Sequence, residues 1–451
     1  MAQSFVRYED AVNWIVGLVS HGIKPGLKRM EMFMEKLGHP ERRLKFIHVA
    51  GTNGKGSTCA YLSEVLHRGG YDVGTFTSPY IEKFTNRMKY NGVDIEEQQL
   101  LDLANRIKPV FDEIAVSELG SPTMFEVCTA VSLLYFGTVT FPDYVVWETG
   151  LGGRLDSTNI VTPVVSIITN IGHDHMDVLG DTIEAVAAEK AGIIKSGVPV
   201  VCTVEDPVAL EVIKRVAKER KSTIYTLHEE FQFEAITNEE NSQKFRFEGP
   251  FRKLPELEIS LNGPHQLKNA SAAMMTLEVL RQYYALMVED DQLQEALKCT
   301  QWAGRLELVS QEPKLILDGA HNPEGAAVLA EALKSTYTYK KLHFMIGMLS
   351  TKYHTGYLSH ILPIVDTLIV TEADYHKKED AAKLADKVYQ QLAQLGRTDV
   401  EVIVETEWKS ALELLQSKID PGDLGVVSGT LYMISDVRAW ILRKADSEKG
   451  W

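Results

Sequence analysis

A glycine-rich loop at residues 51–57, GTNGKGS, lies between an apolar run, KFIHVA, and the start of a helical pattern. Glycines in a strand-to-helix turn let several backbone N–H groups face one anion, and the helix N-terminus adds partial positive charge. Here Lys55 could reach the terminal phosphates of a nucleotide, and the Ser57 hydroxyl could bind Mg²⁺. The candidate phosphate-binding residues are Gly51, Thr52, Asn53, Gly54, Lys55, Gly56 and Ser57.

The spacing of this loop departs from the common phosphate-binding pattern, in which four residues separate the first glycine from the Gly-Lys pair. Gly51 and Gly54 have only two residues between them, and Gly56 stands before Ser57. A tight strand-to-helix turn with spare glycines is the alternative interpretation. Because a strand precedes the loop and a helix follows it, we favour the phosphate site.

A nucleotide site of this kind needs an acidic residue at the end of another strand to hold the metal ion. The segment YVVWETGLGGRLDST places Glu148 at the end of an apolar strand, directly before a glycine-rich turn. A solvated glutamate at a strand end is the common alternative. The combination of this carboxylate with the loop at 51–57 favours a metal ligand.

A third group of ionisable residues, His173, Asp174, His175 and Asp177, follows the strand VVSIITN. Sites in parallel α/β sheets usually lie just past the carboxyl ends of the strands. Residue type would allow zinc, but no partner cysteines are near, so we prefer Mg²⁺ with mixed oxygen and imidazole ligands. For any one of these residues, capping of the helix expected at 181–194 is an equal alternative.

Apolar strands alternate with helical segments around these motifs. The alternation consists of the strands KFIHVA, DVGTFTS, YVVWET, VVSIITN and VPVVCTV and of helices near 57–69, 96–115, 124–137 and 181–194. This pattern predicts an α/β fold with a parallel sheet covered on both faces. Residues 223–261 predict short antiparallel strands. A second alternation begins at QWAGRLELV, so we place a domain boundary near 298–303, between domains at 1–298 and 299–451.

The composition excludes several classes of protein. The chain has 451 residues and a formal net charge of −15, which argues against nucleic acid or an anionic membrane as a partner. Acidic residues precede the first apolar stretch, unlike in a signal peptide, and no apolar run is long enough to span a bilayer. Four dispersed cysteines without a CxxC pair indicate reduced thiols. We therefore expect a cytoplasmic protein.

Seven motifs in order resemble the folylpolyglutamate synthase and dihydrofolate synthase family, which belongs with the Mur-type ATP-dependent amide ligases. They are HVAGTNGKGST, TSPYIEKFTNRM, ETGLGGRLDSTN, HDHMDVLG with EKAGIIK, GPHQLKNA, WAGRLE and DGAHNP, and they run from residue 48 to residue 323. The compressed glycine-rich loop is the family's own form. The resemblance implies a P-loop-type parallel-sheet ATPase domain followed by a second, smaller Rossmann-like α/β domain.

The resemblance also implies a reaction. ATP phosphorylates a carboxylate of a folate, and the amine of L-glutamate attacks the acyl phosphate to give an amide, ADP and phosphate. A carboxylate is a poor electrophile at neutral pH, and phosphate supplies a good leaving group. Because two anions must approach each other, cations and backbone N–H groups have to neutralise the γ-phosphate.

Roles in phosphate and metal binding follow from the matching positions. The loop backbone would hold the phosphates, with Lys55 on their β/γ side. Ser57, Ser78 and Glu148 resemble ligands of one Mg²⁺, and Glu148 and His175 resemble ligands of a second one nearer the acyl phosphate.

The remaining nucleotide contacts are implied to come from both domains. Asn269 resembles the adenine-side asparagine of the family. Arg305, Asp318 and His321 resemble the groups of the second domain that close over the nucleotide, with Arg305 on phosphate and Asp318 on ribose. Such contacts require the two domains to close, so we expect domain motion.

Lys190, in the motif EKAGIIK, matches a lysine that family members carry as a carbamate. Addition of carbon dioxide to a neutral amine turns a cation into an anion, which can then lie beside Mg²⁺. The resemblance therefore implies a catalytic role for Lys190, together with Lys55, Glu148 and His175. Without it, an ordinary surface lysine on a helix would be the preferred interpretation. We expect the neighbouring Lys195 to be exposed.

The folate site is implied to lie under the loop TSPYIEKFTNRM, with Phe125 and Arg154 nearby. An aromatic contact would suit a planar pterin, although a core position for Phe125 is an equal alternative. The L-glutamate site is placed no more closely than the cleft between the domains. The motifs leave open whether the acceptor is dihydropteroate, a folylglutamate or both.

Two other functions share the logic of this active site: a Mur-type ligase acting on a cell-wall precursor, and a regulatory ATPase that ligates nothing. The blocks SPYIEKFTNRM and DGAHNP favour a folate, and the short N-terminal region leaves little room for a nucleotide-sugar domain. Intact Glu148, His175 and Lys190 argue against a degenerate site. We expect a monomer, since one chain contains both nucleotide-facing domains, with small-molecule substrates and neither nucleic acid nor membrane as partners.

Overall fold

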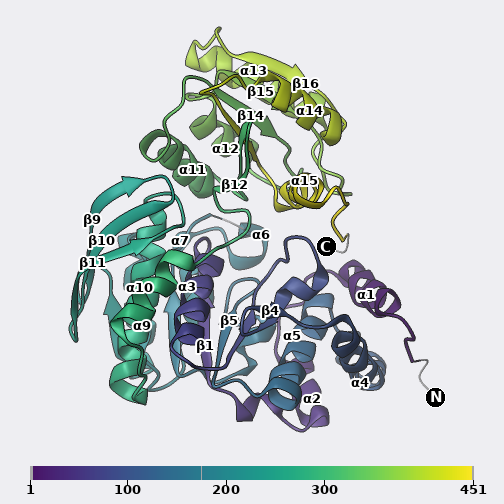
Figure 1. The fold of residues 1–451 in the computed structure, drawn as a ribbon. Coiled ribbons are helices and arrows are strands. Elements are labelled where there is room, and N and C mark those ends of the chain that lie inside the picture. The colour runs from purple at the N-terminus through teal and green to yellow at the C-terminus, as the bar shows by residue number, and fades with distance from the viewer. Residues whose placement is uncertain (1–3, 174, 449–451) are drawn as a thin grey trace.

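The computed structural model describes residues 4–173 and 175–448. An eight-stranded sheet and a six-stranded sheet, each flanked by helices, form two α/β parts, and a three-stranded sheet lies beside them. The second α/β part is stacked on the first, with α11 and α15 on the side that faces it (Figure 1). The predicted α/β class with a larger first part and a smaller second part is confirmed.

The first sheet is built mainly from parallel strands. Its order is β4-β3-β2-β5-β1-β6-β7-β8, in which only β3 and β4 run antiparallel to their neighbours. The strands are β1 Phe46–Ala50, β2 Val73–Phe76, β3 Met88–Tyr90, β4 Val93–Asp94, β5 Tyr144–Glu148, β6 Val165–Ile168, β7 Val200–Cys202 and β8 Ile224–Thr226. The loop at 51–57 follows β1, Glu148 ends β5, and the ionisable cluster at 173–177 follows β6. Because β1 lies between β5 and β6, the carboxyl ends of these three strands meet at one edge of the sheet.

Helices bury both faces of this sheet. The helices of the first part are α1 Tyr8–Gly17, α2 Lys28–Leu37, α3 Lys55–Arg68, α4 Glu97–Ala115, α5 Met124–Tyr135, α6 Met176–Leu179, α7 Ile183–Ala191, α8 Pro207–Glu219, α9 His265–Tyr284 and α10 Asp290–Cys299. On β1 and β5, Ile47 and Val146 face the core under α3, α9 and α10, while Phe46 and Trp147 face the core under α1, α2, α4 and α5. Continuous apolar strands are the consequence, since neither face meets water.

The small sheet consists of β9 Gln232–Glu239, β10 Ser242–Glu248 and β11 Lys253–Ile259, all antiparallel. Phe245 and Phe247, on one face of this sheet, pack in the same hydrophobic core as residues of α9. The prediction of antiparallel strands within 223–261 is therefore confirmed for these three. It is wrong for Ile224–Thr226, which pairs parallel with β7 and extends the first sheet. Local sequence does not specify which sheet a short strand joins.

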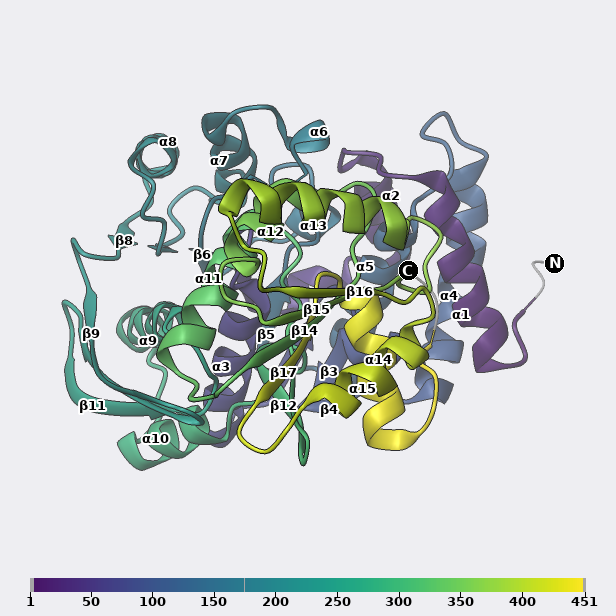
Figure 2. The same ribbon diagram turned by 90° about the horizontal axis from the view of Figure 1, so that it is seen from above.

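The second α/β part has the strand order β12-β13-β17-β14-β15-β16, with β12 antiparallel to β13. Its elements are β12 Glu307–Gln311, β13 Lys314–Leu317, α11 Pro323–Ser335, β14 Leu342–Ile346, α12 His354–Ile361, β15 Thr367–Val370, α13 Ala381–Leu395, β16 Glu401–Val404, α14 Trp408–Lys418, β17 Leu424–Ser428 and α15 Leu431–Arg443. Viewed from above, α12 and α13 lie on one side of the sheet and α14 and α15 on the other (Figure 2). Residues 300–306 connect α10 to β12, which is the region of the boundary proposed near 298–303.

Candidate active site

The glycine-rich loop forms the turn between β1 and α3, as predicted. Gly54 has a φ of 85°, in the left-handed region, and a Cβ there would lie 2.5 Å from Asn269 Oδ1. A Cβ on Gly56 would lie 2.7 Å from Cζ2 of the Trp302 ring. Both glycines are therefore required by close neighbours, and at Gly54 also by the backbone conformation. The neighbours come from segments more than 200 residues further along the chain.

Lys55 and Ser57 lie in the first turn of α3. Lys55 Nζ donates to the carbonyl oxygens of Gly51 at 3.0 Å and Thr52 at 3.3 Å, so the ammonium is folded over the loop. Ser57 is 2% exposed, and Gln266 Nε2 donates to its Oγ at 3.2 Å. Gln266 was missed in the sequence, although the motif GPHQLKNA that contains it was found.

Glu148 ends β5 beside the loop, since Val49 is its partner in the sheet register. The side chain is buried, and its Oε2 accepts a hydrogen bond from the Ser78 backbone N–H at 3.0 Å. Burial raises the pKa of Glu148, opposed by the positive charge of Lys55 and by the Ser78 N–H. A carboxylate held in this way costs free energy unless a cation compensates its charge.

The segment that follows β6 is tied to the glycine-rich loop. Asn170 Oδ1 accepts from Asn53 N at 2.6 Å, and Thr52 Oγ1 accepts from Gly172 N at 3.0 Å. His175 is the N-cap residue of the short helix α6 and has a φ of 54°, a conformation that a non-glycine residue adopts only at some cost. Asp174 and the side chain of Asp177, two members of the predicted cluster, lie outside the described residues.

Lys190 lies in the last turn of α7 and is 4% exposed. The surface position that the sequence favoured in the absence of the resemblance is therefore wrong. Lys195 is not the exposed residue that we expected either: it is half-buried, its Nζ donates to Asn159 O at 3.0 Å, and burial lowers the pKa of this lysine. Both lysines are covered by neighbouring segments that helical periodicity does not reveal.

The second α/β part contributes the remaining groups. Asp318 is buried at the end of β13, where its two oxygens accept from Ala320 N at 2.9 Å and Leu306 N at 3.0 Å. Burial raises the pKa of Asp318, and the guanidinium of Arg305 opposes this shift. His321 Nδ1 lies 2.8 Å from Gly319 O.

One cavity of about 270 Å³ brings these groups together. The residues that the resemblance assigns to ATP, metal or catalysis all line it: Gly51, Thr52, Asn53, Gly54, Lys55, Gly56, Ser57, Ser78, Glu148, His175, Lys190, Asn269, Arg305, Asp318 and His321. His173 of the ionisable cluster after β6 does not line it and contacts Glu324 instead. Residues that the sequence did not single out also line it, among them His265, Lys268 and Glu324. The last follows the recognised block DGAHNP by one position.

The two predicted folate residues do not line this cavity. Phe125 packs against Gly150, where a Cβ would collide with the ring, and its centroid lies 5.9 Å from that of Phe76. Arg154 is exposed and pairs with Glu189 at 2.6 Å. Both residues nevertheless adjoin the glycine-rich turn that follows Glu148.

A larger cleft of about 1000 Å³ runs along the loop TSPYIEKFTNRM and shares Pro79, Arg305 and Leu306 with the first cavity. Glu82 of this loop is buried and forms ion pairs with Arg438 and Arg443 of the second α/β part. The loop is thus held between the two parts of the molecule.

Direct contacts close the two α/β parts over the glycine-rich loop. The side-chain amides of Asn53 and Asn322 exchange hydrogen bonds at 3.3 and 3.4 Å. Glu324 Oε1 accepts from His173 N at 2.9 Å and lies 3.2 Å from His173 Nδ1. The cavity is therefore assembled only when both parts are in contact.

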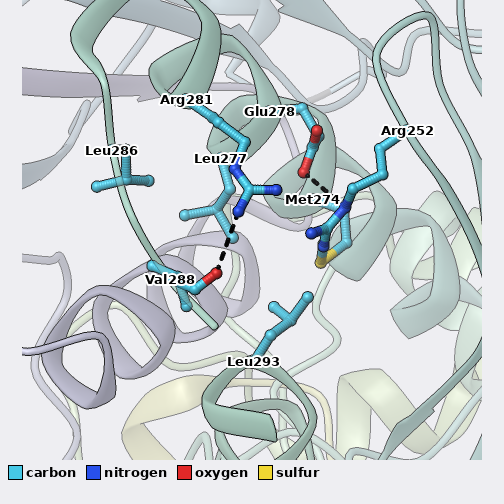
Figure 3. Close-up of a pocket in the computed structure, with 8 residues that line it drawn as sticks. All are labelled: Arg252, Met274, Leu277, Glu278, Arg281, Leu286, Val288 and Leu293. Atoms are coloured by element: carbon cyan, nitrogen blue, oxygen red, sulfur yellow. Dashed lines mark hydrogen bonds and ion pairs between the residues drawn. The ribbon is translucent and has the colours of Figure 1, made fainter. Parts of the chain in front are cut away.

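A second, small cavity lies away from these groups, between α9 and α10 (Figure 3). Its volume of about 20 Å³ leaves room for about one water molecule. Arg252 Nε pairs there with the buried Glu278 at 3.3 Å, and Arg281 donates to Val288 O at 3.5 Å. These contacts link α9 to Arg252, which directly precedes β11, and to Val288 in the connection between α9 and α10, so they have a structural role.

The donors at the main cavity suit a hard cation. Ser57, Ser78 and Glu148 offer two hydroxyl oxygens and a carboxylate, the ligand types that Mg²⁺ prefers. Within residues 4–173 and 175–448, no three His, Cys, Asp or Glu side chains are grouped closely enough to hold a metal ion. A site here would therefore depend on the hydroxyls and on groups of the bound substrates.

Comparison with known proteins gives consistent matches. Residues 49–277 match the Mur ligase middle domain, and residues 304–431 match the glutamate ligase domain of Mur ligases. The chain is 38% identical over 441 residues to a dihydrofolate synthase/folylpolyglutamate synthase of Bacillus subtilis, covering 96% of this chain and 99% of the relative.

Solved structures agree over nearly the whole length. A folylpolyglutamate synthase of Thermotoga maritima is 32% identical with a TM-score of 0.85, covering 98% of this chain and 99% of that one. The E. coli protein FolC, solved in complex with DHPP and ADP, is 27% identical with a TM-score of 0.86, covering 99% of this chain and 100% of that one.

Proposed function

The chain belongs to the folylpolyglutamate synthase and dihydrofolate synthase family of Mur-type ligases, and we propose that it ligates L-glutamate to the carboxylate of a folate as ATP is converted to ADP and phosphate. The observation that carries this proposal is the single cavity that joins the glycine-rich loop, Glu148 and Lys190 to Arg305 and Asp318 of the second domain. A nucleotide bound at the loop would have its terminal phosphate between the two domains.

The residues of the chain would act on the phosphates in a simple order. Backbone N–H groups at the start of α3 bind the phosphates, and the Lys55 ammonium leaves the carbonyl oxygens it now contacts to reach the β/γ side. Arg305 adds positive charge from the second domain, while Asn269 faces the adenine and Asp318 the ribose. His321 completes the cover over the nucleotide. Neutralisation of the γ-phosphate then allows the folate carboxylate to attack it.

Two Mg²⁺ sites are part of the proposal. Ser57, Ser78 and Glu148 would hold the first ion, and Glu148 with His175 the second. When bound, Mg²⁺ would neutralise negative charge on the phosphates of ATP and on the acyl phosphate as it forms. The Ser78 N–H keeps the Glu148 carboxylate oriented toward the loop, since it donates to Oε2 at 3.0 Å.

We also propose that Lys190 is carbamylated. The ammonium first loses one proton; carbon dioxide then adds to the neutral amine, the N–C bond forms and a second proton is released, so the cation becomes a carbamate anion. Support comes from the 4% exposure of Lys190 in the same cavity as Glu148 and His175. An anion at this position complements a metal ion, whereas an ammonium would repel it.

For the folate we propose the neighbourhood of the turn at residues 149–154. Phe125 offers a ring to a planar pterin and Arg154 offers a charge, although both now contact protein groups, Gly150 and Glu189. Substrate binding would therefore need a shift of these side chains or of the turn.

Both walls of the cavity come from one chain, which bears on the oligomeric state. We propose a cytoplasmic monomer with domains at 1–298 and 299–451, because one chain supplies both walls of the cavity. The four cysteines are unpaired, in keeping with a reducing compartment. Within the described ranges, no helix is both long and apolar enough to cross a membrane.

Phosphate release with ATP, Mg²⁺ and L-glutamate tests the proposed function, with dihydropteroate and tetrahydrofolate assayed in parallel as acceptors. Release with both acceptors indicates a bifunctional synthase, and release with tetrahydrofolate alone indicates a dedicated folylpolyglutamate synthase. Absence of release with either would contradict the folate assignment. Release without L-glutamate would instead indicate an ATPase that ligates nothing.

A further inference from the structure

The carboxylates of the main cavity differ in what their oxygens contact. Among the described residues, Glu148, Asp318 and Glu324 are the carboxylates that line it. Glu148 is assigned to the metal, and both oxygens of Asp318 accept backbone N–H groups. Glu324 uses only Oε1, which accepts from His173 N at 2.9 Å. Its Oε2 is buried and has no hydrogen-bond partner.

A buried carboxylate oxygen without a partner is costly, and the side chain itself is 31% exposed and lines the cavity, so a small rotation that turns Oε2 toward a donor bound there would be favoured. Glu324 lies in the first turn of α11 in the second domain, and the metal and phosphate groups lie across the cavity in the first. On the same wall, both oxygens of Asp318 already accept backbone N–H groups, while the guanidinium of Arg305 and the imidazole of His321 can donate to anions. Glu324 is therefore the group on this wall that suits a cation.

L-Glutamate is the substrate that brings a cationic group. Its amine is an ammonium group in water at neutral pH, and it must lose one proton before the neutral amine attacks the acyl phosphate. We propose that Glu324 Oε2 accepts a hydrogen bond from the α-ammonium group of the incoming L-glutamate. This inference rests on the proposed function and assigns a substrate-binding residue to the wall of the cavity formed by the second domain.

The proposal also explains why the amine site would form late. Oε1 of Glu324 accepts from His173 N, so Glu324 faces the groups of the first domain only when the two domains are in contact. An open molecule would present no such site, so the amine would bind after the domains close over the nucleotide. The amine of L-glutamate would then reach the acyl phosphate only after the catalytic groups of both domains are assembled.

The test compares Glu324→Gln, Glu324→Ala and the control Glu331→Gln, which changes an exposed glutamate on the same helix. Initial rates are measured against L-glutamate, and inhibition is measured with glutarate, which has both carboxylates but no amine. Both Glu324 variants should raise the KM for L-glutamate about tenfold or more, the usual effect of losing a charge-assisted hydrogen bond. The KM for ATP, the glutarate inhibition constant and the Glu331→Gln enzyme should change less than twofold.

Other outcomes overturn the proposal in distinguishable ways. If Glu324→Gln matches the parent enzyme and only Glu324→Ala is impaired, the residue serves solely as acceptor for His173 N–H, because the glutamine oxygen can still do so. Weaker Mn²⁺ binding by electron paramagnetic resonance in Glu324→Gln would assign Oε2 to a metal instead. A parent enzyme that consumes ATP without L-glutamate would contradict the proposed function itself.

Discussion

Replacement of Glu148 by glutamine separates the role of its charge from that of its shape. The amide is isosteric and its oxygen can still accept from Ser78 N, now 3.0 Å from Oε2, so the backbone of the loop should stay in place. What disappears is a negative charge on a side chain that is 4% exposed. The change should strongly reduce Mg²⁺-dependent turnover and, at the same time, stabilise the protein without ligands.

The sign of the stability effect follows from the pKa. Burial raises the pKa of Glu148 above its usual value of 4.5. The contribution of this group to stability is therefore fully present below pH 4.5 and is lost as the pH rises through the higher folded pKa. Each unit of elevation costs about 1.4 kcal/mol at neutral pH. Glu148→Gln should therefore raise the Tm at pH 8, and the measured rise reports how strongly burial disfavours the carboxylate, since 1 kcal/mol shifts the Tm of a domain of about 150–250 residues by roughly 2–4 °C.

The assay is differential scanning fluorimetry from pH 5 to pH 8, with phosphate release measured on the same samples. The gain in Tm should shrink toward pH 5, and saturating Mg²⁺ and ATP should protect the parent protein more than the variant. Turnover should fall about 10²- to 10³-fold, as when a key electrostatic group is removed. A lower Tm at pH 8, or turnover near that of the parent, would refute the placement of Glu148 as a buried metal ligand.

Two further substitutions address the loop and the lysine. Lys190→Ala should lower turnover about hundredfold, with partial rescue by acetate, which can supply a carboxylate in the vacated space; Lys334→Ala, on the exposed side of α11, is the control and should be near normal. Equal losses in both would remove the carbamate hypothesis. Gly54→Ala should weaken ADP binding about tenfold by calorimetry, because alanine at this φ costs about 1–2 kcal/mol and its Cβ would displace Asn269. Unchanged ADP affinity would show that the loop tolerates the side chain.

Local sequence predicted much of the nucleotide side of the cavity. Glu148 is the last residue of an apolar strand, and the loop at 51–57 and His175 come after two others; parallel strands present their carboxyl ends at one edge of a sheet. Since β1 lies between β5 and β6, these three segments meet there. Short motifs suffice for such a site because the backbone of the strand and the turn positions the chemical groups.

The tertiary structure decided which side chains are covered and by what. Periodicity did not show that Lys190 is buried, that Lys195 is half-buried, or that Arg154 pairs with Glu189. Nor did it place Ile224–Thr226 in the main sheet. A helical or strand pattern reports which face of an element is apolar, but the neighbour of that face comes from elsewhere in the chain.

The approach of Glu324 to His173 shows the same limit most clearly, since 151 positions separate the two residues in the sequence. Their contact depends on how the second domain packs on the first, which is determined by many weak interactions summed over the interface. A motif records the chemistry that one segment can offer. Only the packing of the two domains determines which of those groups face one substrate.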